Sequence, residues 1–224
     1  MGFEVDGFEL IPSVLDETAL DELRSEFTRL HSGNTAGLRN VLAQSPVIAT
    51  LARSTGIAKL LPLPDFQTVR SLLFDKTPHA NWPVPSHQDR TLTVTEKCEI
   101  DGYGPWTFKN RIAHVEPPAE LLAKMVTLRI HLDDTGPENG PLSVVPGSHH
   151  RGKIPPDQIA GMTEQNATDI ICQAGDVLMM RPLLLHSSRR ATEPTHRRVI
   201  HLEFADPAIL DQRLSWAELF HENP

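Results

Sequence analysis

The chain has 224 residues, the size of one ordinary domain, and a formal net charge of −8 at pH 7. This acidic balance, with no dense block of lysine and arginine, argues against nucleic acid or an anionic membrane surface as the main partner. No apolar run reaches the roughly eighteen residues of a membrane span, and MGFEVDGFELIP does not resemble a signal peptide, so a cytoplasmic protein is expected.

Residues 1–65 are expected to be mainly helical and to support the rest of the domain. GFELI can form a short strand, and Asp16 then stands where a helix N-cap would. Apolar residues follow it at helical spacing, namely Leu20, Leu23, Phe27 and Leu30. A second helix is predicted from Ser45 and Pro46, with serine as its cap and proline in its first turn, to about Gly56.

From residue 66 to residue 205 the sequence predicts strands. Short β-branched or apolar runs alternate with turns rich in Pro, Gly, Asn and Asp: FQTVRSLLF, TLTVT, MVTLRIHL, PLSVVP, DIICQ, DVLMM, PLLLHS and RRVIHLEF. Such spacing favours an antiparallel sandwich or barrel over alternating βαβ units. PPAELLAKM adds one or two helical turns. We therefore predict a mainly β protein with flanking helices, organised as one domain over residues 1–224.

A His-x-Asp triplet occurs twice, as His87-Gln88-Asp89 and as His131-Leu132-Asp133. In a strand, residues two apart point to the same face, so each triplet would present an imidazole beside a carboxylate. A second imidazole from a distant strand would complete the two-histidine, one-carboxylate triad that binds Fe(II) and leaves coordination positions open. The simpler alternative for each triplet is an aspartate that opens a turn beside an unrelated histidine.

The sequence around the two triplets favours the first. Asp133 and Asp134 lead directly into the turn TGPENG, which is typical of carboxylates that cap turns. His87 and Asp89 instead stand at the start of an extended run that follows a proline-rich approach. We therefore take His87 and Asp89 as the better candidate metal ligands.

Three segments resemble the phytanoyl-CoA dioxygenase family of Fe(II)/2-oxoglutarate-dependent oxygenases: FDKTPHANWPVPSHQD, LDDTGPENGPLSVVPGSHHRG and AGDVLMMRPLLLHSSRRATEPTHRRVIHLEF. The resemblance covers residues 66–205 and extends weakly into DGFELIPSVLDETALDEL. It implies a double-stranded β-helix, the cupin-like jelly roll. It also implies that His87, Asp89 and His186 are iron ligands and that Arg197 binds the distal carboxylate of 2-oxoglutarate.

On this resemblance, the strands that carry His186 and Arg197 are expected to lie beside each other and face the interior. A guanidinium suits a carboxylate because its planar fork donates two hydrogen bonds and stays charged. By strand alternation Arg198 would point to the opposite face, and Ser188 would share the face of His186. The Ser188 hydroxyl could then bind the same carboxylate.

Further residues come from segments that the family places near the cosubstrate or the substrate: Lys76, Asn81, Thr127 and Arg129. Thr127 is expected to bind the cosubstrate and the other three the substrate. Arg129 is a charge within the apolar run MVTLRIHL, so it needs either an anionic ligand or an internal salt bridge. Trp82 and Trp106 are expected either to line a substrate pocket or to pack a lid.

The activity implied is oxidation, normally hydroxylation, of an unactivated C–H bond of a small-molecule metabolite. Fe(II) would be the cofactor, and 2-oxoglutarate and O2 would be consumed as succinate and CO2 form. Two alternatives remain at this point: a cupin-like metal enzyme that does not use 2-oxoglutarate, and a non-catalytic jelly-roll binding protein. The sequence shows no basic cluster for the phosphates of a CoA ester. A small or medium-sized metabolite, carrying a carboxylate, is the preferred substrate class. The oligomeric state is left open.

Overall fold

Two facing antiparallel sheets form the body of the protein in the computed structural model, which describes residues 2–31, 37–109 and 111–218. The larger sheet has, in spatial order, β1 (Phe8–Ile11), β11 (Val177–Met180), β8 (Val126–His131), β13 (Arg197–Ala205), β3 (Gln67–Lys76) and β2 (Gly37–Arg39). The smaller sheet has β10 (Thr168–Ile170), β9 (Leu142–Val144), β12 (His186–Ser188) and β4 (Val84–His87). The predicted jelly roll is confirmed, with open sheets in place of a closed barrel.

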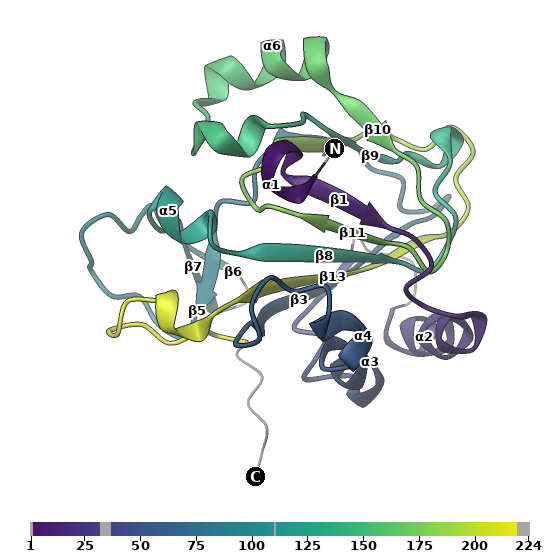
Figure 1. The fold of residues 1–224 in the computed structure, drawn as a ribbon, viewed down its shortest axis with the longest axis horizontal. Helices are drawn as coiled ribbons and strands as arrows, with labels where there is room; N and C mark the ends of the chain where they lie inside the picture. Colours follow the sequence, from purple (N-terminus) through teal and green to yellow (C-terminus); the bar gives the residue numbers. More distant parts are fainter. Residues whose placement is uncertain (1, 32–36, 110, 219–224) are drawn as a thin grey trace.

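A third sheet lies at one end of the molecule (Figure 1). It contains β5 (Leu92–Val94), β7 (Ile112–Val115) and β6 (Trp106–Lys109), in that spatial order. The run TLTVT, predicted as a strand of the main body, therefore forms part of this separate sheet. The short strands β2, β4, β6 and β7 were not predicted, because their three or four residues do not stand out as a β-branched or apolar run between turn residues.

Helices cover the outer face of the larger sheet and the far side of the smaller one. The elements α2 (Glu17–Leu30), α3 (Pro46–Ala52) and α4 (Thr55–Ala58) lie below the larger sheet in Figure 1, and α6 (Pro156–Asn166) lies above β9 and β10. The remaining short helices are α1 (Phe3–Asp6), α5 (Ala119–Leu122), η1 (Pro137–Asn139), η2 (Ser148–Arg151) and η3 (Pro207–Ile209).

Strand alternation divides the larger sheet into an apolar outer face and a polar inner face. On β13 the outward residues Ile200, Leu202 and Phe204 join the hydrophobic core beneath α2 and α3. The intervening residues include Arg197, His201 and Glu203, all of which are buried. The face that meets the smaller sheet therefore carries charged side chains in a dry interior, where they need partners or a ligand.

The predicted helix starts are confirmed by their caps. The Asp16 side chain accepts a hydrogen bond from the Ala19 amide at 2.9 Å, and Ser45 accepts one from Ile48 at 3.1 Å. The predicted end near Gly56 is wrong: α3 ends at Ala52, and the next helix begins immediately afterwards. The Ser54 hydroxyl accepts from the Ile57 amide and so starts α4, which contains Gly56.

The run PLLLHS was predicted as one strand that ends near His186. Instead, β12 begins at His186, and the apolar residues before it lie in a turn and loop. Leu183, Leu184 and Leu185 are buried in three different hydrophobic clusters. Their hydrophobicity therefore reflects packing of a buried connection, which periodicity alone cannot distinguish from a strand.

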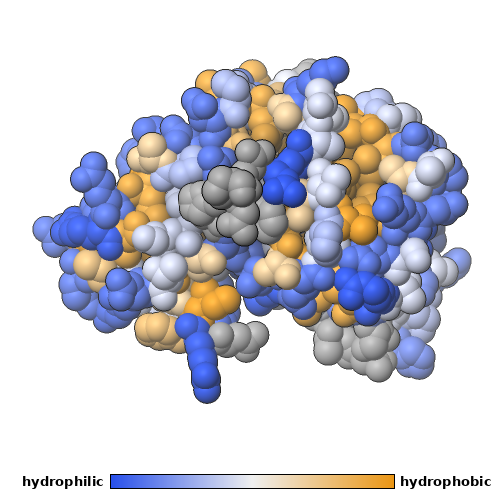
Figure 2. Space-filling view, turned by 90° about the horizontal axis from the view of Figure 1, so that it is seen from below, coloured by the Kyte–Doolittle hydropathy of each residue, from blue (hydrophilic) through white to orange (hydrophobic). Residues whose placement is uncertain are grey.

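The face that carries α2, α3 and α4 is turned toward the viewer in Figure 2, where hydrophobic side chains appear in patches between hydrophilic ones. Leu63, in the loop after α4, is 54% exposed. Among the described residues, no helix combines the length and the apolar character needed to cross a bilayer.

Candidate metal centre

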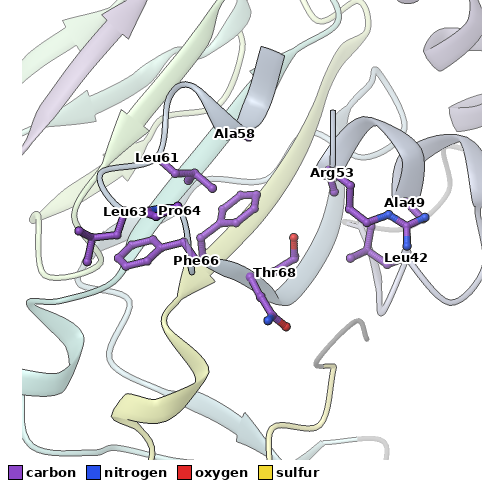
Figure 3. Close-up of a pocket in the computed structure, with 12 residues that line it drawn as sticks. Leu42, Ala49, Arg53, Ala58, Leu61, Leu63, Pro64, Phe66 and Thr68 are labelled. Carbon is purple, nitrogen blue, oxygen red and sulfur yellow. The ribbon is translucent and has the colours of Figure 1, made fainter. Parts of the chain in front are cut away.

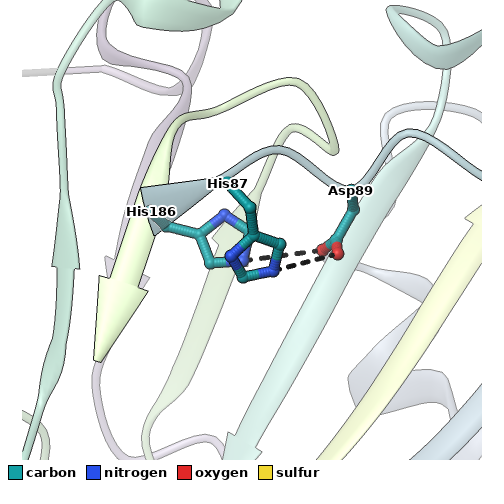
Figure 4. A group of neighbouring side chains, drawn as sticks. All are labelled: His87, Asp89 and His186. Atoms are coloured by element: carbon teal, nitrogen blue, oxygen red, sulfur yellow. Dashed lines mark ion pairs between the residues drawn. The ribbon is translucent and has the colours of Figure 1, made fainter. Parts of the chain in front are cut away.

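His87, Asp89 and His186 converge at the interface of the two sheets (Figure 4). One ligand atom from each lies within 4.8 Å of the others. His87 Nε2 is 3.8 Å from Asp89 Oδ1, and His186 Nε2 is 3.8 Å from Asp89 Oδ2. His87 ends β4, His186 opens β12, and the two residues are direct partners in the antiparallel register. The spacing is open enough for an ion to sit between the three side chains.

Both imidazoles are oriented by their own strands. His87 Nδ1 donates to the Pro85 carbonyl, and His186 Nδ1 donates to the Leu184 carbonyl, each at 2.8 Å. A carbonyl only accepts, so each Nδ1 carries the proton and each Nε2 keeps its lone pair. Histidine ligands of metals are held in this way, with one ring nitrogen bound to the protein and the other directed at the ion.

The electrostatics keep these groups in the forms that bind a cation. Burial lowers the pKa of His186 to about 4, so the ring is neutral at pH 7. Burial alone would raise the pKa of Asp89, but the neighbouring His186, His201 and His87 outweigh this effect and lower it. Asp89 Oδ2 is buried and has no hydrogen-bond partner among the described residues. An ionised carboxylate without a donor is explained by a cation at this point.

A cavity of about 250 Å³ extends from these three residues between the sheets. Side chains from both sheets and from the segment before β4 line it: Phe74, Trp82, Val84, His87, Asp89, Arg129, Leu142, His186, Ser188, Arg197 and His201. Arg197 and Ser188 lie in the same cavity as the histidine pair. The prediction that His186 and Arg197 occupy neighbouring strands is wrong, because β12 and β13 belong to opposite sheets and face each other.

Two buried cations lie side by side at the Arg197 end of the cavity. Lys76 on β3 is the register partner of Arg197 on β13. The Ser188 hydroxyl accepts from Lys76 Nζ at 2.7 Å and from the Arg197 guanidinium at 3.0 Å, and donates to the Gly140 carbonyl at 2.9 Å. Lys76 also donates to the Arg189 carbonyl, and Arg197 to that of Gly140. All these acceptors are neutral oxygens.

Gly140 follows η1 with φ of +61°, which brings its carbonyl between Ser188 and Arg197. A side chain here would meet the Arg189 carbonyl oxygen at 2.7 Å and Lys76 Nζ at 3.2 Å. The turn therefore needs glycine for its conformation and for the close approach of its neighbours.

The cation pair is costly without a counter-ion. Burial, followed by the charge of Arg197, lowers the pKa of Lys76 to about 7. Burial and the nearby Arg129 lower the pKa of Arg197 to about 9. Arg197 Nε is buried with no hydrogen-bond partner among the described residues. This end of the cavity is therefore arranged for a bound anion, because a carboxylate would supply the missing acceptors and charge.

Arg129 occupies the middle of the inner face as the first member of a buried chain of polar contacts. Its guanidinium is 3.1 Å from His201 Nδ1, and His201 Nε2 is 3.4 Å from Glu203 Oε1. The same Glu203 oxygen accepts from Arg70 at 3.1 Å. The internal salt bridge weighed for Arg129 is absent from the described residues, where the hydrogen-bond partner of its guanidinium is the His201 ring and not a carboxylate. Arg129 thus fits the alternative of a charge directed at an anion in the cavity.

His201 and Phe74 were not predicted as site residues, although both line the cavity. Their rings contact each other edge to face, with centroids 5.7 Å apart. His201 follows Arg197 by an even number of residues along β13, so alternation from Arg197 would have indicated it. Phe74 is set by the pairing of β3 with β13, which the sequence alone does not supply.

Of the other predicted site residues, one lines the cavity and three do not. Trp82, expected in a substrate pocket or in a lid, lines the cavity. Asn81 instead binds the backbone of Ala191 through both ends of its amide, which fixes the loop before β13. Trp106 lies on β6 in the third sheet, and Thr127 pairs with Met180 and Glu203 toward the far end of β8 from Arg197. The structure does not bring Trp106 or Thr127 into the cavity.

The second His-x-Asp triplet, His131-Leu132-Asp133, is not part of the metal-ligand cluster of His87, Asp89 and His186. The Asp133 carboxylate makes a bidentate pair with Arg198, at 2.9 and 2.6 Å. Arg198 therefore points to the face opposite Arg197, as alternation predicted. His131 is buried on the inner face, with Nδ1 3.2 Å from the Thr135 hydroxyl. Asp133 points outward and His131 inward because Asp133 lies beyond the end of β8.

A larger cavity of about 440 Å³ lies on the outer side, beside α3 and α4 (Figure 3). It is lined mainly by apolar side chains: Leu42, Ala49, Ala52, Arg53, Ala58, Leu61, Leu63, Pro64, Phe66, Gln67, Thr68 and Phe204. None of the described residues that line it is a histidine, a cysteine or a carboxylate, so this lining lacks the groups for metal binding or acid–base chemistry. The chemistry-bearing side chains are instead gathered between the two sheets.

Comparison with known proteins identifies the same family that the sequence motifs resemble. The family model described as phytanoyl-CoA dioxygenase (PhyH) matches residues 3–199, which is most of the chain. No curated protein matches the sequence.

Solved structures of similar fold include AviO1 from Streptomyces viridochromogenes Tue57, at 25% identity over 93% of this chain and 94% of that chain, with a TM-score of 0.68. HygX from Streptomyces hygroscopicus, solved with nickel and 2-oxoglutarate bound, shares 20% identity over 91% of this chain and 84% of that one, with a TM-score of 0.65. The non-heme α-ketoglutarate-dependent epimerase SnoN from nogalamycin biosynthesis shares 18% identity over 92% and 80%, with a TM-score of 0.67. At these identities HygX and SnoN show likeness of fold.

Proposed function

The chain belongs to the phytanoyl-CoA dioxygenase family, and from this premise we propose that it is an Fe(II)- and 2-oxoglutarate-dependent dioxygenase that hydroxylates a small-molecule metabolite. His87, Asp89 and His186 would hold the metal. The observation that carries this assignment is the pair of imidazoles whose Nδ1 protons are bound to backbone carbonyls while both Nε2 atoms face Asp89. This donor set suits Fe(II) and leaves positions for other ligands.

The anion-binding end of the same cavity supports 2-oxoglutarate as cosubstrate. Arg197 would bind its distal carboxylate, with Ser188 and Lys76 as further donors. Lys76 was first considered a substrate contact, but its position beside Arg197 favours this role. Arg197, Ser188 and the three candidate metal ligands line one cavity, and we propose that a short diacid bound there contacts both ends. A metal enzyme without such a cosubstrate would leave the Lys76–Arg197 pair without a counter-ion, so this alternative is disfavoured.

With the metal and 2-oxoglutarate bound, the site would supply oxidative decarboxylation to succinate and CO2, coupled to transfer of one atom of O2 into a C–H bond of the substrate. The protein's part is to bind and orient the metal and the cosubstrate and to exclude water from the cavity. Ser188 and Gly140 fix the Arg197 guanidinium, and the strand carbonyls fix the two imidazoles. Phe74, Leu142 and Val84 line the cavity with apolar surface, which keeps the reacting centre dry.

The reaction is tested by incubating the Fe(II)-loaded protein with 2-oxoglutarate, O2 and a panel of small metabolites. Succinate release that depends on both Fe(II) and one metabolite, together with a product that gains one oxygen atom in mass, is expected. Loss of two hydrogens, or a change of stereochemistry without a gain of oxygen, would instead assign desaturation or epimerisation. Failure to release succinate at any metabolite, with no binding of Fe(II) or 2-oxoglutarate, would favour a non-catalytic jelly roll.

A further inference from the structure

A second cavity, of about 380 Å³, adjoins the metal centre on the side away from Arg197. It shares Phe74, His87, Asp89 and His201 with the first cavity, so the two meet at the candidate metal ligands. Its other lining residues come from β2, β3, β13, the segment after β4, and the third sheet with the residue that follows β7: Arg39, Arg70, Leu72, Gln88, Arg90, Thr91, Lys109, Glu116 and Glu203. If 2-oxoglutarate occupies the first cavity, this second one is the space left for the substrate.

The lining of the second cavity is hydrophilic. Leu72 and Phe74 are its only apolar members among the described residues. Pockets for apolar ligands are lined mainly by aliphatic and aromatic side chains. An acyl chain placed here would leave charged groups desolvated against hydrocarbon, which is unfavourable. The cavity therefore suits a polar molecule.

Two of its four cations are already neutralised by carboxylates. Arg70 pairs with Glu203 at 3.1 Å, and Arg90 pairs with Glu116 at 2.8 Å. The remaining carboxylate, Asp89, belongs to the metal centre. Both glutamates are thus engaged in direct ion pairs within the protein, and neither pairs directly with Arg39 or Lys109.

The other two cations have no such partner. The side chains of Arg39 and Lys109 make no hydrogen bond or ion pair within the part of the chain that the structure describes, and both are exposed at the mouth of the cavity. They come from different sheets, on β2 and β6. Both line the same cavity, and burial, followed by the charges of Arg39 and Arg70, lowers the pKa of Lys109. Two free cations therefore face one polar cavity that reaches the metal centre.

We propose that the substrate is a small, hydrophilic metabolite with an anionic group, a carboxylate, phosphate or sulfate, that binds Arg39 and Lys109 while its reacting carbon lies toward His87 and Asp89. This inference rests on the proposed function for the identity of the reaction. Arg39 and Lys109 would act in recognition, because charge-assisted contacts at the mouth fix one end of a molecule and so set which C–H bond is presented.

The same anionic chemistry could come from the phosphates of a CoA ester, whose basic cluster the sequence did not reveal. The polar lining between these cations and the metal favours the small metabolite, since the acyl chain of a CoA ester would have to cross that region. Coenzyme A is therefore included as a separate arm of the test.

The test uses inorganic sulfate as the probe and the full-length protein, loaded anaerobically with Fe(II) and saturated with 2-oxoglutarate so that Arg197 and Lys76 are occupied. The midpoint of thermal unfolding is followed as sulfate replaces chloride at constant ionic strength. A saturable rise is expected in the unmodified protein. In the double variant Arg39→Gln/Lys109→Gln, at least about ten times more sulfate should be needed for half of this rise, as expected when charge-assisted contacts are lost.

The matched control is Lys59→Gln/Lys124→Gln, which also removes two positive charges, from exposed lysines that do not line the cavity. It should respond to sulfate like the unmodified protein. This control also subtracts the general stabilisation that sulfate gives to folded proteins. An equal response of the two double variants would overturn the proposal.

The thermal shifts given by 2-oxoglutarate and by coenzyme A show which of the two proposals fails, the anionic substrate or the oxygenase itself. If 2-oxoglutarate raises the unfolding midpoint of every variant while sulfate does not distinguish them, the anionic substrate is wrong and the oxygenase assignment stands. If 2-oxoglutarate stabilises none of them, the proposed function is at fault. Stabilisation by coenzyme A at about a tenth of the sulfate concentration that gives the same shift, lost in Arg39→Gln/Lys109→Gln, would replace the small metabolite by a CoA ester.

Discussion

His87 and His186 lie directly opposite each other on β4 and β12, and each donates its Nδ1 proton to the backbone carbonyl two residues earlier. Their ring centroids are 4.3 Å apart. This symmetry is produced by the strands themselves, without help from other side chains. Both Nε2 lone pairs are consequently directed toward Asp89 before any ligand arrives, so little reorganisation is needed to bind a metal ion.

The first prediction concerns the metal ligands. His87→Ala and His186→Ala should each lose stoichiometric Fe(II) binding, measured by anaerobic equilibrium dialysis, because each removes one of three protein ligands. His131→Gln should keep Fe(II) binding, since His131 contacts Thr135 and lies outside the triad. Loss of iron from His131→Gln but not from His87→Ala would mean that the wrong triplet has been chosen.

The second prediction concerns the two neighbouring arginines on β13. Arg197→Ala should weaken 2-oxoglutarate binding by about 1.5–3 kcal/mol, roughly ten- to a hundred-fold, because a charge-assisted contact is lost. Arg198→Ala is the matched control: it breaks the ion pair with Asp133 on the opposite face and should leave 2-oxoglutarate affinity unchanged. Isothermal titration of Fe(II)-loaded protein without oxygen measures both. Equal losses in the two variants would contradict the strand register.

The third prediction follows from the lowered pKa of Lys76. Burial, and the charges of Arg197, Arg129, Arg189 and Arg190 that face it, lower this pKa from 10.5 to about 7. A bound dicarboxylate would stabilise the ammonium form and raise the pKa again. Binding should therefore take up a proton above pH 7, and affinity for 2-oxoglutarate should be fully present below the free-state pKa and fall as pH rises through it.

Isothermal titration between about pH 6 and about pH 8 checks this effect, because a lysine with its ordinary pKa stays fully charged over this range and would give no change. Lys76→Met keeps the length of the side chain but cannot titrate, so its affinity should be lower at the acidic end and should vary less with pH. A pH dependence as steep in Lys76→Met as in the unmodified protein would exclude Lys76 as its source.

The fourth prediction separates stability from metal binding at Gln88, between two candidate ligands. Its amide is directed away from the metal centre and donates to the carbonyls of Gly152 and Leu183, at 2.8 and 2.6 Å, while it accepts from the Ile154 amide at 2.8 Å. Gln88→Ala should lower the free energy of unfolding by about 2–4 kcal/mol, because buried groups lose their partners. Fe(II) affinity of the folded protein should change little. Urea unfolding and dialysis together test this; iron loss at unchanged stability would point to a direct role.

Much of the fold could be predicted because it depends on local pattern. The caps at Asp16 and Ser45 and the long strands β3, β8 and β13 combine clear periodicity with turn residues at their ends. The third sheet could not be predicted as a separate sheet: β5 was recognised as a strand, but its neighbours β6 and β7 are short, and β6 is largely exposed. The connection at Leu183–Leu185 was mistaken for part of a strand because burial without regular structure gives the same apolar run.

The site was predictable to the extent that strand alternation determines direction. Alternation correctly predicted that Arg197 and Arg198 point to opposite faces of β13, and that Ser188 and His186 share one face of β12. The sequence could not show which strands face each other across the interior, so Lys76 was assigned to the substrate although it adjoins Arg197. For the same reason Arg39 and Lys109, which come from strands too short to recognise, were not foreseen at the mouth of the second cavity.

A single site that holds Fe(II) and 2-oxoglutarate together is tested most directly by anaerobic titration of the Fe(II)-loaded protein with 2-oxoglutarate, followed by visible absorption. Chelation of the metal by the 2-oxo acid gives a charge-transfer band, so a band that saturates is expected in the unmodified protein and in Arg198→Ala. Arg197→Ala should require more 2-oxoglutarate, and His186→Ala should give no band. Binding of 2-oxoglutarate without any visible band, or a band that persists in His186→Ala, would contradict a shared site at His87, Asp89 and His186.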